Sequence, residues 1–275
     1  MDIKDILLPI RPGDNSGAAA IAAAMARDLG ACVQGVCLPP LPSLQPSDCY
    51  AIGATAVSDV LRRMDDEEAG VEAVVQSVFE AAMDAAGCER EWRGAEPGEL
   101  AAQTALRARL ADLSIMPRPA AHDAIGQQLA ETLVRMGGSP CLLIPDRGPP
   151  PYPFKHVVVA WNGSRGAKRA MDDAMPLLRR AETVQALVVG DPDGREPNRP
   201  GLKRHLARHG VKADILALPV GRGGAAAALI AYCGDHAADL LVMGAFGHSP
   251  RAEQWLGGTT WTVLTTVSTP VFMSA

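Results

Sequence analysis

The segment GAFGHSPRAEQWLGGTT, residues 244–260, combines glycines with hydroxyl side chains at a spacing that suits phosphate binding. A phosphate is held by several backbone N–H groups that converge on it, and glycine permits this close approach because it has no Cβ. The start of a helix adds unpaired N–H groups and a positive dipole end. The segment therefore predicts a phosphate-binding loop with these members: Gly244, Gly247, Gly257, Gly258, Thr259 and Thr260.

The sequence around this loop predicts parallel strands that alternate with helices. Short apolar runs such as HVVVAW, residues 156–161, are typical of strands buried on both faces of a sheet. In such sheets ligands bind beyond the carboxyl ends of the strands, which is where the glycine loop lies. In the second half we expect strands at 156–161, 184–190, 211–218, 239–243 and 270–274, and helices near 165–181, 200–209, 224–237 and 257–266. Pro176 is expected to kink or split the first of these helices.

The first half of the chain repeats the pattern of the second. ADLSIMP at 111–117 matches ADLLVMG at 238–244, and SPCLLIP at 139–145 matches TPVFMSA at 269–275. Between the halves, residues 145–154 hold five prolines, which exclude a helix or a central strand at that place. The repeat therefore predicts two α/β domains, residues 1–147 and residues 152–275.

The first half also departs from the second. An insertion at 38–65 begins with a proline-rich stretch, expected to be a loop, and ends in a part expected to form a short helix; a role as a lid or an interface is open. Helices are expected near 66–87 and 98–110. The counterpart of the glycine loop carries Pro117 and Pro119, and each proline removes an N–H group that could face a phosphate. We therefore expect no phosphate binding in the first half.

The glycine loop resembles the nucleotide loop of the universal stress protein family. The shared pattern is Gly244-x-x-Gly247, nine residues, then Gly257-Gly258-x-Thr260, and residues 154–182 resemble the opening of the second domain in tandem members. The resemblance implies two tandem doubly wound, Rossmann-like domains, each with a parallel sheet of strand order 3-2-1-4-5. It also implies ATP or AMP as the ligand of the second domain, and it leaves open whether Mg²⁺ accompanies the nucleotide.

The same resemblance implies roles for individual residues. The adenosine would be bordered by Ala160, Trp161 and Asn162, ribose or adenine would be contacted by Met243 and Gly244, and the phosphates would be contacted by Gly247, Gly257, Gly258 and Thr259. His248 would touch a phosphate or cap the loop. Two positions depart from the family pattern, because Asn162 stands where Asp is usual and Gly258 stands where Ser or Thr is usual. Thr259 or Thr260 would have to supply the missing hydroxyl.

No combination of residues predicts a catalytic or metal site. His205 and His209 lie four residues apart on an expected helix, but they lack a third ligand, so an exposed basic helix face is favoured over zinc. Asp235 and His236 have no nucleophile beside them in the sequence. The six cysteines form no CxxC pair and are expected to be packed as thiols. We expect no efficient enzyme, and slow ATP hydrolysis stays open.

Composition limits the partners. The net charge of −5, with no basic block, argues against nucleic acid, and the absence of an export signal or a long apolar run indicates a cytoplasmic protein without a membrane anchor. We predict a stress-response regulatory protein that binds an adenine nucleotide; the alternative is a ligand-free protein-interaction module. As in the family, the end strands near 141–145 and 270–274 are expected to pair antiparallel and form an internal pseudo-dimer, while a homodimer stays open.

Overall fold

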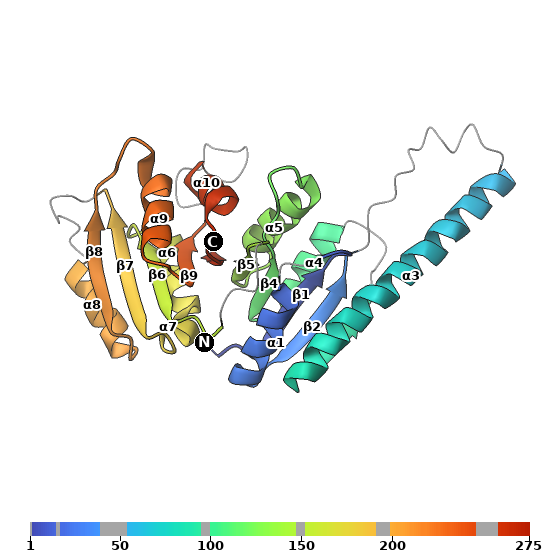
Figure 1. Cartoon of the computed structure of the whole chain (residues 1–275), viewed down its shortest axis with the longest axis horizontal. Helices are drawn as coiled ribbons and strands as arrows, with labels where there is room; N and C mark the ends of the chain where they lie inside the picture. The colour runs from blue at the N-terminus through green and yellow to red at the C-terminus, as the bar shows by residue number, and fades with distance from the viewer. Residues whose placement is uncertain are drawn as a thin grey trace.

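The computed structural model describes residues 2–14, 17–38, 54–94, 100–146, 152–190, 199–245 and 258–275 (Figure 1). The first half contains β1 (Asp5–Ile10), α1 (Ala18–Leu29), β2 (Cys32–Cys37), α3 (Ala54–Ala86), β3 (Glu89–Arg93), α4 (Leu100–Ala108), β4 (Leu113–Pro117), α5 (Ala124–Met136) and β5 (Cys141–Ile144). The second half contains β6 (His156–Trp161), α6 (Arg165–Asp173), α7 (Met175–Leu178), β7 (Thr183–Val189), α8 (Arg199–Arg208), β8 (Ala213–Leu218), α9 (Gly224–Asp235), β9 (Leu240–Gly244), α10 (Gly258–Thr266) and β10 (Val271–Ser274). Within each half the described strands are separated by helices, with α6 and α7 following one another between β6 and β7, as expected for an α/β fold.

All the described strands join one sheet in the order β3-β2-β1-β4-β5-β10-β9-β6-β7-β8. Each half therefore has the predicted order 3-2-1-4-5, and the strands within each half are parallel. The halves meet where β5 and β10 pair antiparallel, with Leu142 opposite Phe272. This confirms the predicted pairing of the two end strands, and the shared sheet leaves neither of them with an unpaired edge.

The two faces of the sheet carry separate hydrophobic clusters. Along β1, Ile6 and Leu8 belong to one cluster and Leu7 belongs to the other, as the alternation of side chains along a strand requires. Helices α1, α3, α6, α7 and α8 contribute to the first cluster, and α4, α5, α9 and α10 contribute to the second. Because both faces are covered, the strands are apolar throughout, which is the pattern that made them recognisable in the sequence.

An equivalent carboxylate anchors the start of the first strand in each half. Asp112 accepts hydrogen bonds from the backbone N–H groups of Lys4 and Asp5, at 2.7 and 3.0 Å. Asp239 accepts the same pair of bonds from Lys155 and His156, at 2.8 and 2.9 Å. Both aspartates lie at the matched ADL positions of the sequence repeat, so the repeat extends to a side-chain contact.

Two helices bear on the sequence expectations. The helix expected at 66–87 is α3, a continuous helix of 33 residues that begins at Ala54. The short separate helix expected in the later part of the insertion is therefore wrong, because no proline interrupts residues 54–86. Figure 1 shows that α3 extends beyond the sheet, and the rest of the insertion, residues 39–53, lies outside the described residues. The expected split at Pro176 is confirmed, since α6 ends at Asp173 and α7 begins at Met175.

Within the described part of the chain, no helix combines the length and the apolar character needed to cross a membrane.

Candidate functional site

A cavity of about 150 Å³ lies at the carboxyl ends of β6, β7 and β9. It is lined by Ala160, Trp161, Asn162, Ser164, Ala167, Leu187, Val189, Ala225, Leu229, Met243, Gly244 and Thr260. Six of these were predicted from the sequence: Ala160, Trp161, Asn162, Met243, Gly244 and Thr260. The fold thus brings the end of β6, the end of β9 and the first turn of α10 to one place.

The remaining predicted site residues do not line this cavity in the described part of the chain. Gly258 and Thr259 form the beginning of α10, which is the helix start expected at the end of the glycine loop. Gly247, His248 and Gly257 lie outside the described residues. Contacts between these residues and a phosphate therefore stay predictions.

The cavity has apolar walls and a polar margin. Leu187 and Val189 of β7 and Leu229 of α9 supply the aliphatic surface. A cavity of about 150 Å³ is the size known to admit a small aromatic ring in other proteins. None of the described lining residues is Asp, Glu, Lys, Arg or His, so these side chains provide packing and neutral hydrogen-bonding groups and no ionic charge.

The polar margin is built by the turn that leads from β6 into α6. Ser164 caps α6, and its Oγ accepts a hydrogen bond from the Ala167 N–H at 3.2 Å. The Oδ1 of Asn162 accepts a hydrogen bond from the Ser164 N–H at 3.1 Å. Asn162 thereby stabilises the turn, which is a role that Asn and Asp share because both carry a side-chain oxygen at this distance. The departure from Asp at this position leaves the turn intact.

Gly244 is in close contact with the first turn of α6. A Cβ atom built on Gly244 would lie 2.4 Å from both the Ala167 nitrogen and the Gly166 carbonyl carbon. A Cβ on Gly166 would in turn lie 3.0 Å from the Ala245 carbonyl oxygen. The sequence interpretation gave Gly244 its role through close approach of a ligand, whereas the structure supplies a packing reason that holds without any ligand.

Trp161 and Thr260 are the most enclosed of the predicted polar residues. Trp161 is 9% exposed, and its Nε1–H has no hydrogen-bond partner among the described residues. Thr260 is 6% exposed at the start of α10. Trp161 is in the same hydrophobic cluster as α6, so core packing accounts for its burial.

Six lining residues were missed by the sequence reasoning: Ser164, Ala167, Leu187, Val189, Ala225 and Leu229. Ser164 carried a usable signal, because a serine three residues before the apolar face of a helix is typical of an N-cap. Leu187 lies opposite Ala160 in the pairing of β6 with β7, so the correct register would have found it. The alanine and leucine on α9 carry no signal that separates them from ordinary core residues.

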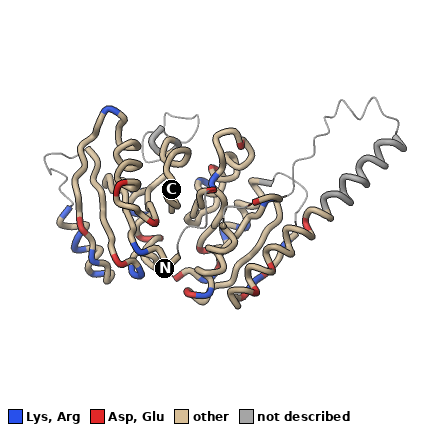
Figure 2. Tube along the Cα trace, viewed as in Figure 1, with Lys and Arg blue, Asp and Glu red and all other residues tan. Residues whose placement is uncertain are grey.

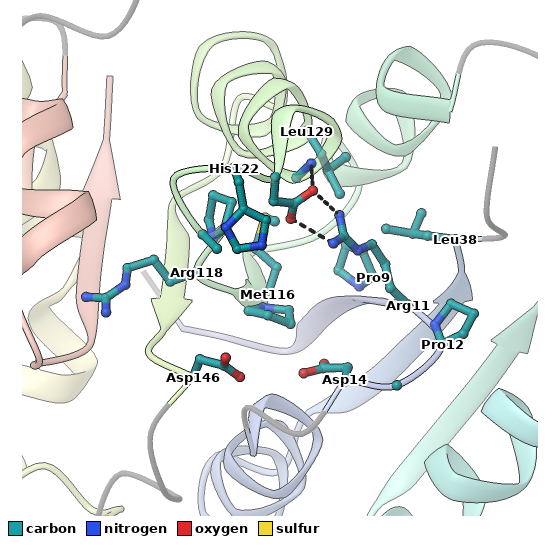
Figure 3. A pocket seen from close by; sticks show the side chains of 16 residues that line it. Pro9, Arg11, Pro12, Asp14, Leu38, Met116, Arg118, His122, Leu129 and Asp146 are labelled. Carbon is teal, nitrogen blue, oxygen red and sulfur yellow. Dashed lines mark hydrogen bonds and ion pairs between the residues drawn. The ribbon is translucent and has the colours of Figure 1, made fainter.

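The first half has its own cavity, of about 210 Å³, between the ends of β1 and β4 and the start of α5 (Figure 3). Pro117 and Pro119 line it, as does Asp123, which caps α5 and accepts a hydrogen bond from the Gly126 N–H. Arg118 turns away from this cavity and donates a hydrogen bond to the Val267 carbonyl of the second half. The first half therefore retains a concave surface at the position where the second half has its candidate site.

The other candidate clusters are accounted for by local packing. The rings of His205 and His209 lie 4.6 Å apart, and His205 Nε2 lies 3.3 Å from Asp172 Oδ1. No group of three or more potential metal ligands occurs in the described ranges. Lys203, Arg204 and Arg208 of the same helix, α8, are exposed. Figure 2 shows basic residues along this helix, in keeping with a basic helix face.

Two further groups have no catalytic arrangement. The ring of His236 stacks on Tyr232 with centroids 3.9 Å apart, and its Nδ1 lies 3.0 Å from the Tyr232 carbonyl oxygen, which places His236 at the exposed end of α9. The five cysteines in the described residues are free thiols. Burial raises the pKa of Cys141 and of Cys233 to about 12. These two thiols are therefore suited to packing and not to nucleophilic chemistry.

Comparison with known proteins relates the second half of the chain to one family. The model of the "Universal stress protein family" matches residues 153–274. A curated relative, Universal stress protein Slr1230 from Synechocystis sp., is 28% identical over 145 residues, which are 51% of this chain and 48% of that protein. The chain thus matches about half the length of this relative.

Solved structures share the fold over nearly the whole chain. A universal stress protein from Archaeoglobus fulgidus superposes with a TM-score of 0.72 at 16% identity, covering 100% of this chain and 99% of that one. A protein of unknown function from Pseudomonas aeruginosa superposes with a TM-score of 0.62 at 14% identity, covering 99% and 92%. At this identity the superpositions show the fold alone. The resemblance to the universal stress protein family therefore rests on residues 153–274, which the family model matches.

Proposed function

We propose that this chain is a stress-response regulatory protein that binds ATP or AMP in its second half. The observation that carries the proposal is the cavity that joins Ala160, Asn162, Met243 and Thr260 at the carboxyl ends of the central strands. Ligands of open α/β sheets bind at this edge, where the order of the strands reverses between β6 and β9. Residues 152–275 would form the nucleotide-binding domain, and residues 1–147 a degenerate copy of it.

The described residues fit the adenosine part of the nucleotide. Adenine is flat and largely apolar on its faces, and Leu187, Val189 and Leu229 provide a wall of matching character. The side-chain amide of Asn162 carries both a donor and an acceptor, so it can exchange hydrogen bonds with ribose or adenine at the margin. The phosphates would extend toward the start of α10, where the first turn offers backbone N–H groups and Thr260 adds a hydroxyl.

Regulation by binding suits this site better than catalysis. The described lining has no group that titrates near neutral pH, so it offers no general acid or base and no carboxylate to hold Mg²⁺ beside the adenosine. We therefore propose that the nucleotide is a ligand whose occupancy is sensed, and that any hydrolysis is slow.

The second candidate function is a ligand-free interaction module. It is favoured by two observations, since Asn162 Oδ1 is already engaged by the Ser164 N–H and the glycine at 244 is required by α6. Both features are compatible with a fold that has kept the turn and the packing after losing the nucleotide.

Mass spectrometry of small molecules released from the purified chain separates the two candidates. The nucleotide proposal expects ATP or AMP to be released on denaturation, or to raise the melting temperature when added at millimolar concentration. A chain that carries no nucleotide, shows no thermal shift with either compound and yet captures a defined protein partner would favour the ligand-free interaction module instead.

A further inference from the structure

The cavity of the first half has a distinctive arrangement of charge. Arg11, at the carboxyl end of β1, donates from Nη1 to Asp123 Oδ1 at 2.9 Å and from Nη2 to Asp123 Oδ2 at 2.7 Å. Asp123 Oδ1 also accepts from the Gly126 N–H, at 3.0 Å, in the first turn of α5. The Asp123 side chain is only 18% exposed, so this contact lies within the wall of the cavity (Figure 3).

A bidentate guanidinium and an N–H group at the start of a helix form the donor set that proteins use to hold phosphate. In this cavity the same donor set is occupied by a carboxylate of the chain itself. Arg11 and Asp123 are 112 positions apart, so the pairing is a product of the fold and not of local sequence. The carboxylate carries the charge and the oxygens that a bound anion would bring.

The remaining charges of the cavity disfavour a second anion. Asp14 and Asp146 also line it, and Figure 3 shows their carboxylates turned toward each other across the opening. Arg118 directs its guanidinium to the Val267 carbonyl and away from the cavity. Among the described lining residues, the guanidinium that faces the cavity is thus that of Arg11, and Asp123 already neutralises it.

We propose that Asp123 is the specificity-determining residue of the first-half cavity, where it takes the place of a ligand phosphate. The cavity then excludes phosphate-bearing molecules and takes a compact organic ligand that is uncharged or cationic. Its volume of about 210 Å³ and its apolar wall of Pro9, Met116 and Leu129 suit such a ligand. The first-half cavity would thereby take a ligand of a different chemical class from a nucleotide, and this role of Asp123 does not depend on whether the second half binds a nucleotide.

The replacement Asp123→Asn tests the proposal with pyrophosphate as the probe. Asparagine keeps an oxygen for the Gly126 N–H and removes the negative charge, so Arg11 becomes available to an external anion. Calorimetry of the full chain is expected to show one more pyrophosphate site per molecule than the unsubstituted chain. Adding Arg11→Gln is expected to weaken that site by about tenfold or more, because a bidentate charge-assisted contact is lost.

The matched control is Asp112→Asn, the same chemical change at a carboxylate that accepts two backbone N–H groups at the other end of β1. It is expected to add no site. Crystals of Asp123→Asn soaked in pyrophosphate should show the anion between Arg11 and Gly126, which distinguishes it from any anion in the second half. Asp123→Ser, which also keeps a capping oxygen, is measured in parallel in case the asparagine variant does not fold.

Two results would overturn the proposal. One is a pyrophosphate bound between Arg11 and Gly126 in the unsubstituted chain. The other is a folded Asp123→Asn or Asp123→Ser variant, with an unchanged circular dichroism spectrum, that gains no site.

Discussion

The backbone of Gly166 lies directly against Gly244, so closely that a Cβ on Gly244 would be 2.4 Å from the Gly166 carbonyl carbon. This contact fixes the first turn of α6 on the end of β9, and these two elements together form one side of the second-half cavity. The packing of α6 against β9 therefore requires glycine at position 244, whether or not a ligand binds there.

We expect Gly244→Ala to destabilise the chain by about 3 kcal/mol or more, because the added methyl group meets backbone atoms that cannot rotate away. Denaturant unfolding followed by circular dichroism measures the change. Gly201→Ala is the control, since Gly201 is within α8 and a Cβ placed on it would have no neighbouring atom within 4 Å. That variant is expected to be neutral or more stable by about 0.5–1 kcal/mol. Equal effects of the two substitutions would contradict the packing role.

Filling the second-half cavity should weaken nucleotide binding without harming the fold. Ala225 of α9 lines the cavity, so Ala225→Leu is expected to raise the dissociation constant for ATP or AMP by about tenfold or more, equivalent to about 1.4 kcal/mol. Ala227 is exposed on the same helix and is not among the lining residues, so Ala227→Leu should leave the affinity unchanged. If both variants bind as the parent does, the nucleotide is held elsewhere or not at all.

More of the fold than of the candidate site could be predicted from the sequence. The strand order and the pairing of β5 with β10 follow from two repeated sets of apolar runs, because few arrangements bury such runs on both faces. The length of α3 could not be derived, since a surface helix beyond the sheet has no repeat partner to compare with. Leu187 and Leu229 were missed because an apolar side chain that lines a cavity has the same sequence pattern as one that fills a core.

The contact between Arg11 and Asp123 also could not be predicted from the sequence. Pro117 and Pro119 predict only the loss of backbone N–H groups, and in the structure both residues line the first-half cavity. In the structure, the start of α5 is capped by the carboxylate of Asp123, which also accepts hydrogen bonds from Arg11, a residue distant in the sequence. Such a pair becomes visible only when the topology places the end of β1 beside the start of α5.

Tyr152 links the two halves and should titrate abnormally. Its hydroxyl donates to Asp28 Oδ2 at 2.8 Å, and Arg180 Nε donates to the same oxygen at 2.7 Å. Burial, with the hydrogen bond to Asp28 as the second cause, raises the pKa of the Tyr152 phenol above its usual value. Because the folded state holds the proton more tightly, this group stabilises the fold below about pH 10 and loses that contribution as the pH rises further.

We expect Asp28→Asn to lower the pKa of Tyr152 toward the ordinary value, because the charge that opposes ionisation is removed. Ultraviolet titration of the parent and of the variant measures the shift, with Tyr152→Phe identifying the signal. If the pKa of Tyr152 is the same in the parent and in the Asp28→Asn variant, burial alone sets it.

The buried thiols should be protected from alkylation in the folded chain. With a pKa of about 12, Cys141 and Cys233 are thiolates in only about one molecule in ten thousand at about pH 8. Iodoacetamide is therefore expected to modify them only after unfolding, as measured by peptide mass spectrometry. Because the folded state holds both thiol protons more tightly than the unfolded state, each thiol adds to the free energy of unfolding. This contribution is fully present below about pH 8.5 and is lost as the pH approaches 12. Rapid labelling of either cysteine in the native chain would contradict the burial on which these statements rest.

We propose that the second half binds an adenine nucleotide at the carboxyl ends of β6 and β9. Isothermal titration calorimetry of the full chain with ATP, and separately with AMP, tests it most directly. We expect saturable binding of at least one of them at one site per chain, weakened by Ala225→Leu and unaffected by Ala227→Leu. No heat of binding with either nucleotide at millimolar concentration would contradict it.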